Sequence, residues 1–278
     1  MSSLRRIFSF DHIIRSLIKL SALITFGALF FIVGYIFIRG IPHLTLDMFA
    51  LEYTTENVSM LPAIITTLML VALTLVIATP IGVFTGFYLV EYAKKGNKFV
   101  DLIRITTETL SGIPSIVYGL FGMLFFVYRL GFSYSLLAGT LTAAIMVLPL
   151  IIRSTEEALM AVDDSLREAS FGLGAGKLRT IFRVVLPVAM PGILSGVILS
   201  IGRVVGETAA LMYTLGTAAK MTDGLFSSGR TLSLHMFVLS NEGLYVNEAY
   251  AVGVVLLLIV LAINGLSTYL SNKLRKGE

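Results

Sequence analysis

Long apolar stretches alternate with short polar connections along most of the chain. Six stretches are apolar over the roughly 20 residues that a helix needs to cross the hydrocarbon core of a bilayer. They cover about 18–38, 62–89, 107–128, 134–152, 188–215 and 247–270. The pattern predicts an all-α, polytopic membrane protein with six transmembrane helices.

Helix-breaking residues interrupt two of these stretches. The third contains Gly112-Ile113-Pro114 together with Glu108, so we expect it to begin as an irregular or broken helix packed inside protein. The fourth carries Pro149 near its end, and proline lacks an N–H donor and clashes with the preceding turn. We therefore expect a kink at this proline.

Composition supports a membrane location and narrows the chemistry. Of the 278 residues, 56% are hydrophobic and 14% are charged, with a mean hydropathy of +0.89, whereas soluble domains carry roughly 25% charged residues. The absence of cysteine excludes disulfides, thiolate metal sites and cysteine nucleophiles. His12, His43 and His235 lack metal-ligand spacing, and no serine–histidine–acid set with a nucleophile elbow occurs. We expect no metal site and no catalytic residue, hence no enzyme.

Basic residues are distributed unevenly over the connections, and this bias predicts the orientation. Sixteen of the 21 Lys and Arg residues fall on one side: Arg5, Arg6, Arg15, Lys19, Lys94, Lys95, Lys98, Arg104, Arg153, Arg167, Lys177, Arg179, Arg183, Lys273, Arg275 and Lys276. Four fall on the other: Arg39, Arg129, Lys220 and Arg230. Because positive charge stays cytoplasmic, both termini are predicted to be cytoplasmic. The same bias explains the basic balance without a nucleic-acid partner.

The predicted spans divide the chain into four segments. A cytoplasmic N-terminal segment covers 1–16, and the first transmembrane helix with an external loop covers 17–60. A core with five transmembrane helices covers 61–270 and includes a cytoplasmic loop at 153–187. The remaining 271–278 form a cytoplasmic tail.

The glycine-rich string GLGAGKL at 172–178 looks at first like a phosphate-binding P-loop. That motif needs a glycine, four residues and then Gly-Lys-Ser/Thr, because backbone N–H groups wrap the phosphates and the hydroxyl holds magnesium. Counting from Gly176-Lys177 puts Phe171 at the first glycine position and Leu178 at the hydroxyl position. We therefore expect the chain to bind no ATP and no magnesium.

The loop 153–187 has the pattern of two helices joined by a turn. The string SLRE from Ser165 to Glu168 is a capping box, which predicts that a short helix starts there. Gly174 can adopt the left-handed conformation that ends a helix. A second segment, KLRTIFRVVLP, is predicted to stop at Pro187. The glycines then form a sharp turn between two helices on the cytoplasmic face; the alternative is a solvated linker.

The string EASFGLGAGKLRTIFRVVLP resembles the cytoplasmic EAA loop of ABC importer permeases. That pattern reads Glu-Ala-Ala, three residues, Gly, nine residues, Ile, any residue, Leu-Pro. The matching positions are Glu168, Ala169, Gly174, Leu186 and Pro187, with Ser170 for the second Ala and Val184 for Ile. The resemblance implies that Glu168, Ala169, Ser170 and Gly174 dock into a cleft of a separate subunit, which uses ATP and magnesium. It also implies a structural role for Leu186 and Pro187 at the loop end.

The fifth apolar stretch contains two charged residues, Arg203 and Glu207. A charge near the bilayer centre costs roughly 2.5–3.5 kcal/mol on insertion scales, so such residues face a bundle interior or an aqueous path. A spacing of four places both on one helix face, where they can neutralise each other. The pair is either a structural ion pair or part of a substrate pathway in which Arg203 meets an anion and Glu207 positions it.

The strings GRVVGETAAL, SGIPSIVYGLFG and RSTEEAL resemble the permeases of the phosphate-specific ABC importer, more closely the PstA type of its two homologous permeases. The resemblance covers roughly 60–270. It implies a type I ABC importer permease fold in a prokaryotic plasma membrane. It also implies a heterodimer with a second permease, two ATP-binding subunits and an extracytoplasmic phosphate-binding protein.

The functional hypothesis is therefore inward transport of inorganic phosphate, driven by ATP hydrolysis on another subunit. A permease for another oxyanion, such as sulfate, molybdate or phosphonate, is an alternative in the same class. A stand-alone secondary anion carrier is an alternative from another class; inverted repeats would favour it, and the EAA loop argues against it.

Overall fold

The structure is a computed structural model that describes residues 2–93 and 96–276, and its regular elements are all helical over these ranges. Lys94 and Lys95, which contribute to the orientation argument, and residues 277–278 of the predicted tail lie outside the described residues. So do the side chains of Arg5, Arg6, Lys273, Arg275 and Lys276.

Eleven α-helices are present in the described ranges: α1 (Ser2–Gly40), α2 (Leu61–Phe87), α3 (Lys98–Ser111), α4 (Ser115–Gly122), α5 (Leu136–Met160), α6 (Asp164–Gly172), α7 (Lys177–Thr180), α8 (Leu186–Val205), α9 (Ala209–Met212), α10 (Leu232–Glu242) and α11 (Val246–Lys276). Short 3₁₀ helices follow α1 at Ile41–His43 and Leu46–Phe49, and π-helical turns extend α2, α4 and α7 at Tyr88–Tyr92, Met123–Arg129 and Ile181–Val185.

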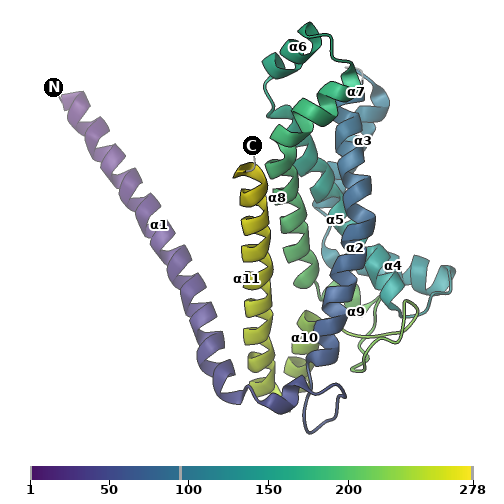
Figure 1. Cartoon of the computed structure of the whole chain (residues 1–278). Helices are drawn as coiled ribbons and strands as arrows, with labels where there is room; N and C mark the ends of the chain where they lie inside the picture. Colours follow the sequence, from purple (N-terminus) through teal and green to yellow (C-terminus); the bar gives the residue numbers. More distant parts are fainter. Residues whose placement is uncertain (1, 94–95, 277–278) are drawn as a thin grey trace.

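Five helices in the described ranges are long and apolar enough to cross a membrane, or six if a bent pair counts as one span. They cover His12–His43, Leu61–Tyr92, Leu136–Met160, Lys177–Val205 and Val246–Tyr269. Figure 1 shows the N-terminal end of α1, the C-terminal end of α11 and the pair α6 and α7 toward the same end of the bundle, with α10 toward the other. The prediction of an all-α, polytopic membrane protein is confirmed.

Helix α1 is splayed away from the other helices along most of its length (Figure 1). Near its C-terminal end it packs on α11 (Val246–Lys276), where the rings of Tyr35 and Tyr250 meet edge to face at 5.7 Å. Gly40 ends α1 against the backbone carbonyl of Tyr250, so closely that a Cβ atom would overlap that oxygen. A glycine at the end of α1 therefore allows the chain to pass close to α11 as it leaves this helix.

Helices α2, α5 and α8 form the core, and glycines bring them into close contact. A Cβ atom on Gly82 of α2 would lie 2.6 Å from Ile151 Cγ2, and one on Gly86 would lie 2.6 Å from Thr155 Cγ2. Small residues spaced by four let membrane helices approach until their backbones nearly touch. Helix α2 therefore lies directly on α5.

A neighbouring face of α5 is packed in the same manner against α8. A Cβ atom on Gly192 would lie 2.6 Å from the Ala158 Cβ, and one on Gly196 would overlap the Ser154 side chain. Because densely packed interiors do not deform continuously, α2, α5 and α8 are expected to move together.

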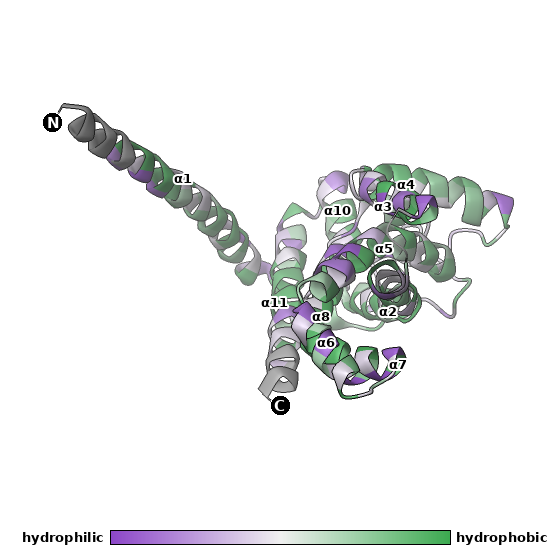
Figure 2. Ribbon diagram, turned by 90° about the horizontal axis from the view of Figure 1, so that it is seen from above, coloured by the Kyte–Doolittle hydropathy of each residue, from purple (hydrophilic) through white to green (hydrophobic). Residues whose placement is uncertain are grey.

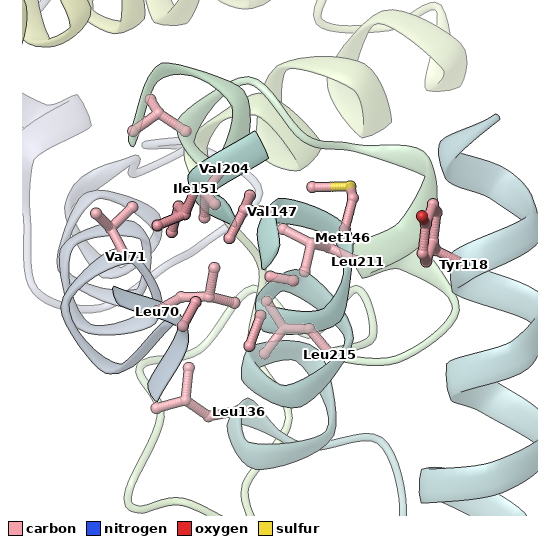
Figure 3. Packing of buried hydrophobic residues seen from close by; sticks show 14 residues of the cluster. Leu70, Val71, Tyr118, Leu136, Met146, Val147, Ile151, Val204, Leu211 and Leu215 are labelled. Carbon is pink, nitrogen blue, oxygen red and sulfur yellow. The ribbon is translucent and has the colours of Figure 1, made fainter. Parts of the chain in front are cut away.

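Apolar side chains fill the remaining space between these helices. Figure 3 shows Leu70 of α2 near residues of α5, with Val204 of α8 and Leu211 of α9 completing the cluster. Figure 2 shows hydrophilic positions on α6 and α7, whereas α4 is largely hydrophobic. The core is thus continuous from α2 through α8, and the polar loop helices lie at its end.

The third predicted span is broken more strongly than the sequence suggests. Helix α3 and the α4 segment meet at 105°, so the stretch 107–128 is not one continuous helix. The break falls at the predicted Gly112-Ile113-Pro114, because Pro114 has an extended ψ of 141° and cannot continue α3. Pro149, by contrast, lies inside α5, which continues to Met160.

The fifth predicted span, 188–215, is wrong at both ends. The helical segment begins at Lys177 and ends at Val205. Near its start, in the π-helical turn, the Leu186 N–H donates a hydrogen bond to the Ile181 carbonyl. This wider turn displaces the backbone that the Pro187 ring would otherwise clash with, so the helix continues through the proline. The prediction that this segment stops at Pro187 was therefore wrong.

Candidate functional site

The predicted two-helix loop is present, with one change in its capping. The N-cap of helix α6 is Asp163, two residues before the predicted Ser165, and its Oδ1 accepts a hydrogen bond from the Ser165 N–H at 2.8 Å. This bond, to a charged acceptor at a helix N-terminus, lowers the pKa of the Asp163 carboxyl. The capping box headed by Ser165 was wrong. Gly174 has φ +81°, which confirms the left-handed turn after α6.

The EAA-like residues are placed on two different sides of α6. Glu168 and Ala169 are exposed, as is Gly174. Ser170 is half-buried instead, and its Oγ lies 2.9 Å from the Thr180 Oγ1 of α7. Ser170 therefore holds the two loop helices together rather than presenting its side chain outward.

Apolar side chains accompany the exposed part of α6. Leu173 is 90% exposed and Phe171 is 47% exposed, in a segment with no buried residue. We call the set Glu168, Ala169, Phe171 and Leu173 the loop face. Exposed apolar residues flanked by polar ones are typical of interaction surfaces. Leu186 and Pro187 lie half-buried where the loop enters the bundle.

Arg203 and Glu207 do not share a helix. Helix α8 ends at Val205 with Gly206 as its C-cap, so Glu207 lies beyond the helix and the predicted common face was wrong. Gly202 and Gly206 weaken the helix here, because glycine costs about 1 kcal/mol relative to alanine in a helix interior. The ion pairs between the described residues include none that joins Arg203 to Glu207.

Glu207 instead organises the chain after α8. It is 8% exposed, and its Oε1 accepts from the Ala210 N–H at 2.9 Å, which caps the start of α9. Its backbone carbonyl accepts from the Ser233 Oγ of α10 at 2.7 Å. Glu207 therefore joins α8, α9 and α10.

Arg203 is half-buried near the end of α8. It interacts electrostatically with Tyr118 of α4, whose hydroxyl donates to the Leu110 carbonyl at 2.7 Å. A guanidinium has five N–H donors and can bind an anion through paired hydrogen bonds.

A cluster of Arg230, Tyr53 and His235, not anticipated from the sequence, lies at α10. Arg230 is 4% exposed and its guanidinium carbon lies 4.8 Å from the centre of the Tyr53 ring. His235 is fully buried and meets the same ring edge to face at 6.0 Å. Burial, and then the nearby Arg230 charge, lower the pKa of His235 to about 3. A lone arginine in a loop carries no pattern that would reveal this cluster.

The family is defined by comparison with known proteins. The model of the family described as binding-protein-dependent transport system inner membrane component matches residues 78–276. A probable ABC transporter permease protein, YqgI, of Bacillus subtilis (strain 168) is 32% identical over 96% of both chains.

Two further relatives are named phosphate transport system permease protein PstA. The one from Pasteurella multocida (strain Pm70) is 37% identical over 71% of this chain and 72% of its own length. The one from Mycobacterium leprae (strain TN) is 42% identical over 59% of this chain and 53% of its own length. The resemblance to PstA-type permeases is confirmed by these relatives.

Solved structures share the fold. A bacterial alginate ABC transporter in complex with an alginate pentasaccharide-bound periplasmic protein contains a chain with TM-score 0.68, at 15% identity and covering 95% of this chain and 96% of that one. A chain of the MetNI methionine ABC transporter gives TM-score 0.60, at 20% identity and covering 77% of this chain and 94% of that one.

The chain is thus a multi-helix membrane protein that shares its fold with chains of these two ABC transporters. The chain belongs to the family of inner membrane components of binding-protein-dependent transport systems.

Proposed function

We propose that the chain is a permease subunit of an ATP-driven importer of inorganic phosphate. The observation that carries the proposal is Arg203, which forms no ion pair with an acidic side chain among the described residues, since α8 ends before Glu207. A guanidinium offers paired donors that match the oxygens of phosphate. The PstA names of the relatives favour phosphate as the anion.

The partners follow from this function. We propose a heterodimer with a homologous permease, two ATP-binding subunits that use ATP and magnesium, and an extracytoplasmic phosphate-binding protein. The transporter would lie in a prokaryotic plasma membrane with both termini and the loop 153–187 in the cytoplasm. The loop face on α6 would dock into the ATP-binding subunit, with Glu168 as its charged member.

Two alternatives differ in what they require. A permease for another oxyanion, such as sulfate, would use the same guanidinium donors, so competition experiments separate it from a phosphate permease. A secondary carrier would need no ATP-binding subunit, and the exposed apolar side chains of Phe171 and Leu173 argue against it.

Radiolabelled phosphate uptake in cells that carry the whole transporter tests the function. Arg203→Ala should abolish uptake with assembly intact, and excess sulfate or molybdate should not compete in the wild type. Arg203→Lys, which keeps the charge without the paired donors, is expected to retain part of the uptake. Normal uptake in Arg203→Ala would mean that Arg203 serves only in packing. Competition by sulfate would mean that the transported ion is not phosphate alone.

Docking is tested separately through the loop face. Glu168→Arg should release the ATP-binding subunit during purification while the permease stays inserted, because it reverses the charge of an exposed residue at the proposed interface. Arg179→Glu reverses a charge that is also exposed but lies outside the loop face, and it should leave co-purification unchanged. Equal recovery of the ATP-binding subunit in both variants would count against docking through α6.

A further inference from the structure

Arg167 of α6 makes a contact that links the loop to two core helices. Its Nε and Nη2 donate to Oε1 of Glu91 at 3.2 and 3.0 Å. Its Nη2 also donates to the Leu159 carbonyl at 2.9 Å, and its Nη1 donates to the Val162 carbonyl at 2.7 Å and to Asp164 Oδ1 at 3.0 Å. A guanidinium has five N–H donors, so every donor of Arg167 has an acceptor.

The pair is sheltered from solvent. The Arg167 and Glu91 side chains are 14% and 9% exposed, whereas the nearby pair Arg153–Glu157 on α5 is 59% and 62% exposed. Exposed pairs contribute little, but breaking a sheltered pair leaves an uncompensated charge. The Arg167–Glu91 contact therefore resists opening.

Glu91 receives a second contact from the other helix of the loop. It lies in the π-helical turn Tyr88–Tyr92 that ends α2, and its backbone carbonyl accepts a hydrogen bond from Lys177 of α7. The Lys177 ammonium also lies 4.6 Å from the centre of the Tyr92 ring. Helices α6 and α7 thus hold the same end of α2.

Little else attaches α6 to the core. None of its residues is buried, and within the described residues the other hydrogen bond from one of its side chains to a neighbouring element is Ser170–Thr180 to α7. The ends of α2 and α5 that Arg167 joins are the ends packed through Gly86 and Thr155. A displacement of α6 therefore reaches α2 and α5 through Arg167.

We propose that Arg167 and Glu91 are a positioning pair that transmits the movement of the loop face to α2, so that ATP hydrolysis on the docked subunit drives the opening and closing of the membrane path. The inference rests on the proposed function, because it needs α6 to dock on an ATP-binding subunit. It assigns docking and transmission to different residues, since Glu168 points outward and Arg167 points to α2.

The test measures a distance that does not depend on the cargo. The chain has no cysteine, so spin labels can be placed on Ser165→Cys of α6 and Val76→Cys of α2, both exposed, in an assembled transporter with cysteine-free partners. With the pair intact, the distance between the labels should be the same without nucleotide and with trapped ATP. In Glu91→Gln it should become nucleotide-dependent or broaden.

Transport gives the second measurement. Phosphate imported per ATP hydrolysed should fall about tenfold in Glu91→Gln, in the range expected for substitutions along a coupling network, with the ATP-binding subunit still co-purifying. In Arg167→Lys, which keeps the charge but reaches fewer acceptors, the phosphate imported per ATP should fall less. In Glu157→Gln, the same substitution at the exposed pair, this ratio should equal that of the wild type.

The outcomes separate the two proposals. A label distance that changes with nucleotide in the wild type, or that stays constant in Glu91→Gln, overturns the inference. A label distance that stays constant in the wild type and becomes nucleotide-dependent in Glu91→Gln, together with no phosphate uptake in the wild type, overturns phosphate as the cargo and leaves the positioning pair in place.

Discussion

Two arginines that are largely shielded from solvent, Arg167 on α6 and Arg230 before α10, are accommodated in opposite ways. All five donors of Arg167 have acceptors, including the carboxylate of Glu91. Arg230 is more deeply buried, yet its Nε and Nη2 have no hydrogen-bond partner among the described residues. Its main neighbour is the face of the Tyr53 ring.

The difference shows that burial of a charged side chain does not by itself reveal whether the side chain stabilises the fold. A guanidinium with full pairing fixes the geometry of the elements that it joins, whereas buried donors without acceptors cost about 1–3 kcal/mol each. At the loop end of the bundle the charge is held by directional bonds. At the other end it is held by an aromatic face and apolar packing, so it costs stability in this chain.

Replacing Arg167, whose donors are all paired, should cause the largest loss of stability. Arg167→Met should lower the free energy of unfolding by about 3 kcal/mol, because Glu91 then keeps a sheltered negative charge without its cation. Denaturation of the detergent-solubilised transporter, followed by far-UV circular dichroism because the chain has no tryptophan, measures the change. The control is Arg153→Met at the exposed pair, with an expected change below about 1 kcal/mol. Equal losses in both variants would contradict the comparison.

A smaller change of the opposite sign is expected at the unpaired site. Arg230→Met should raise the free energy of unfolding by about 1–2 kcal/mol, because it removes buried donors and keeps an unbranched stem over the Tyr53 ring. Arg39, which is exposed and lies 5.7 Å from the Tyr35 ring, provides the matched control. Arg39→Met should change stability by less than about 0.5 kcal/mol. A loss in Arg230→Met would mean that the assembled transporter supplies an acceptor.

The same contrast explains how much the sequence predicts. Apolar runs located the spans because membrane helices need length, and Gly174 was predictable because a left-handed turn after a helix favours glycine. The sequence placed Arg203 and Glu207 on one helix because the apolar run continues past Gly206. The end of α8 there depends on tertiary contacts such as the Ser233 hydrogen bond to the Glu207 carbonyl.

The partners of Arg167 and Arg230 could not be predicted from the sequence, because they lie far away in the chain. Arg167 was counted only as a loop charge, since Glu91 lies far upstream at the end of another helix. Arg230 and His235 meet through Tyr53, which belongs to the segment between α1 and α2. Periodicity and local motifs describe neighbours in the chain, whereas these clusters arise from packing between distant segments.

The free energy of unfolding should also depend on pH through His235, by less than Arg167→Met changes it. The pKa of His235 is about 3 in the folded chain against an ordinary 6.5, so below pH 6.5 the unfolded chain binds a proton that the folded chain does not. Stability is complete above pH 6.5 and is lost as the pH falls toward 3. Between pH 7 and 5.5 the loss from His235 should be about 1.2 kcal/mol.

Unfolding measured at these two pH values in the wild type and in His235→Phe checks this contribution, since phenylalanine keeps the ring against Tyr53 and cannot titrate. His43→Gln, at a half-exposed histidine whose ring bonds the Arg39 carbonyl, should retain the wild-type loss. An unchanged pH dependence in His235→Phe would mean that His235 takes up its proton in the folded chain. Because Arg230 lies beside it, that result would require an anion between the two side chains, and Arg230 would then belong with Arg167 among the paired sites.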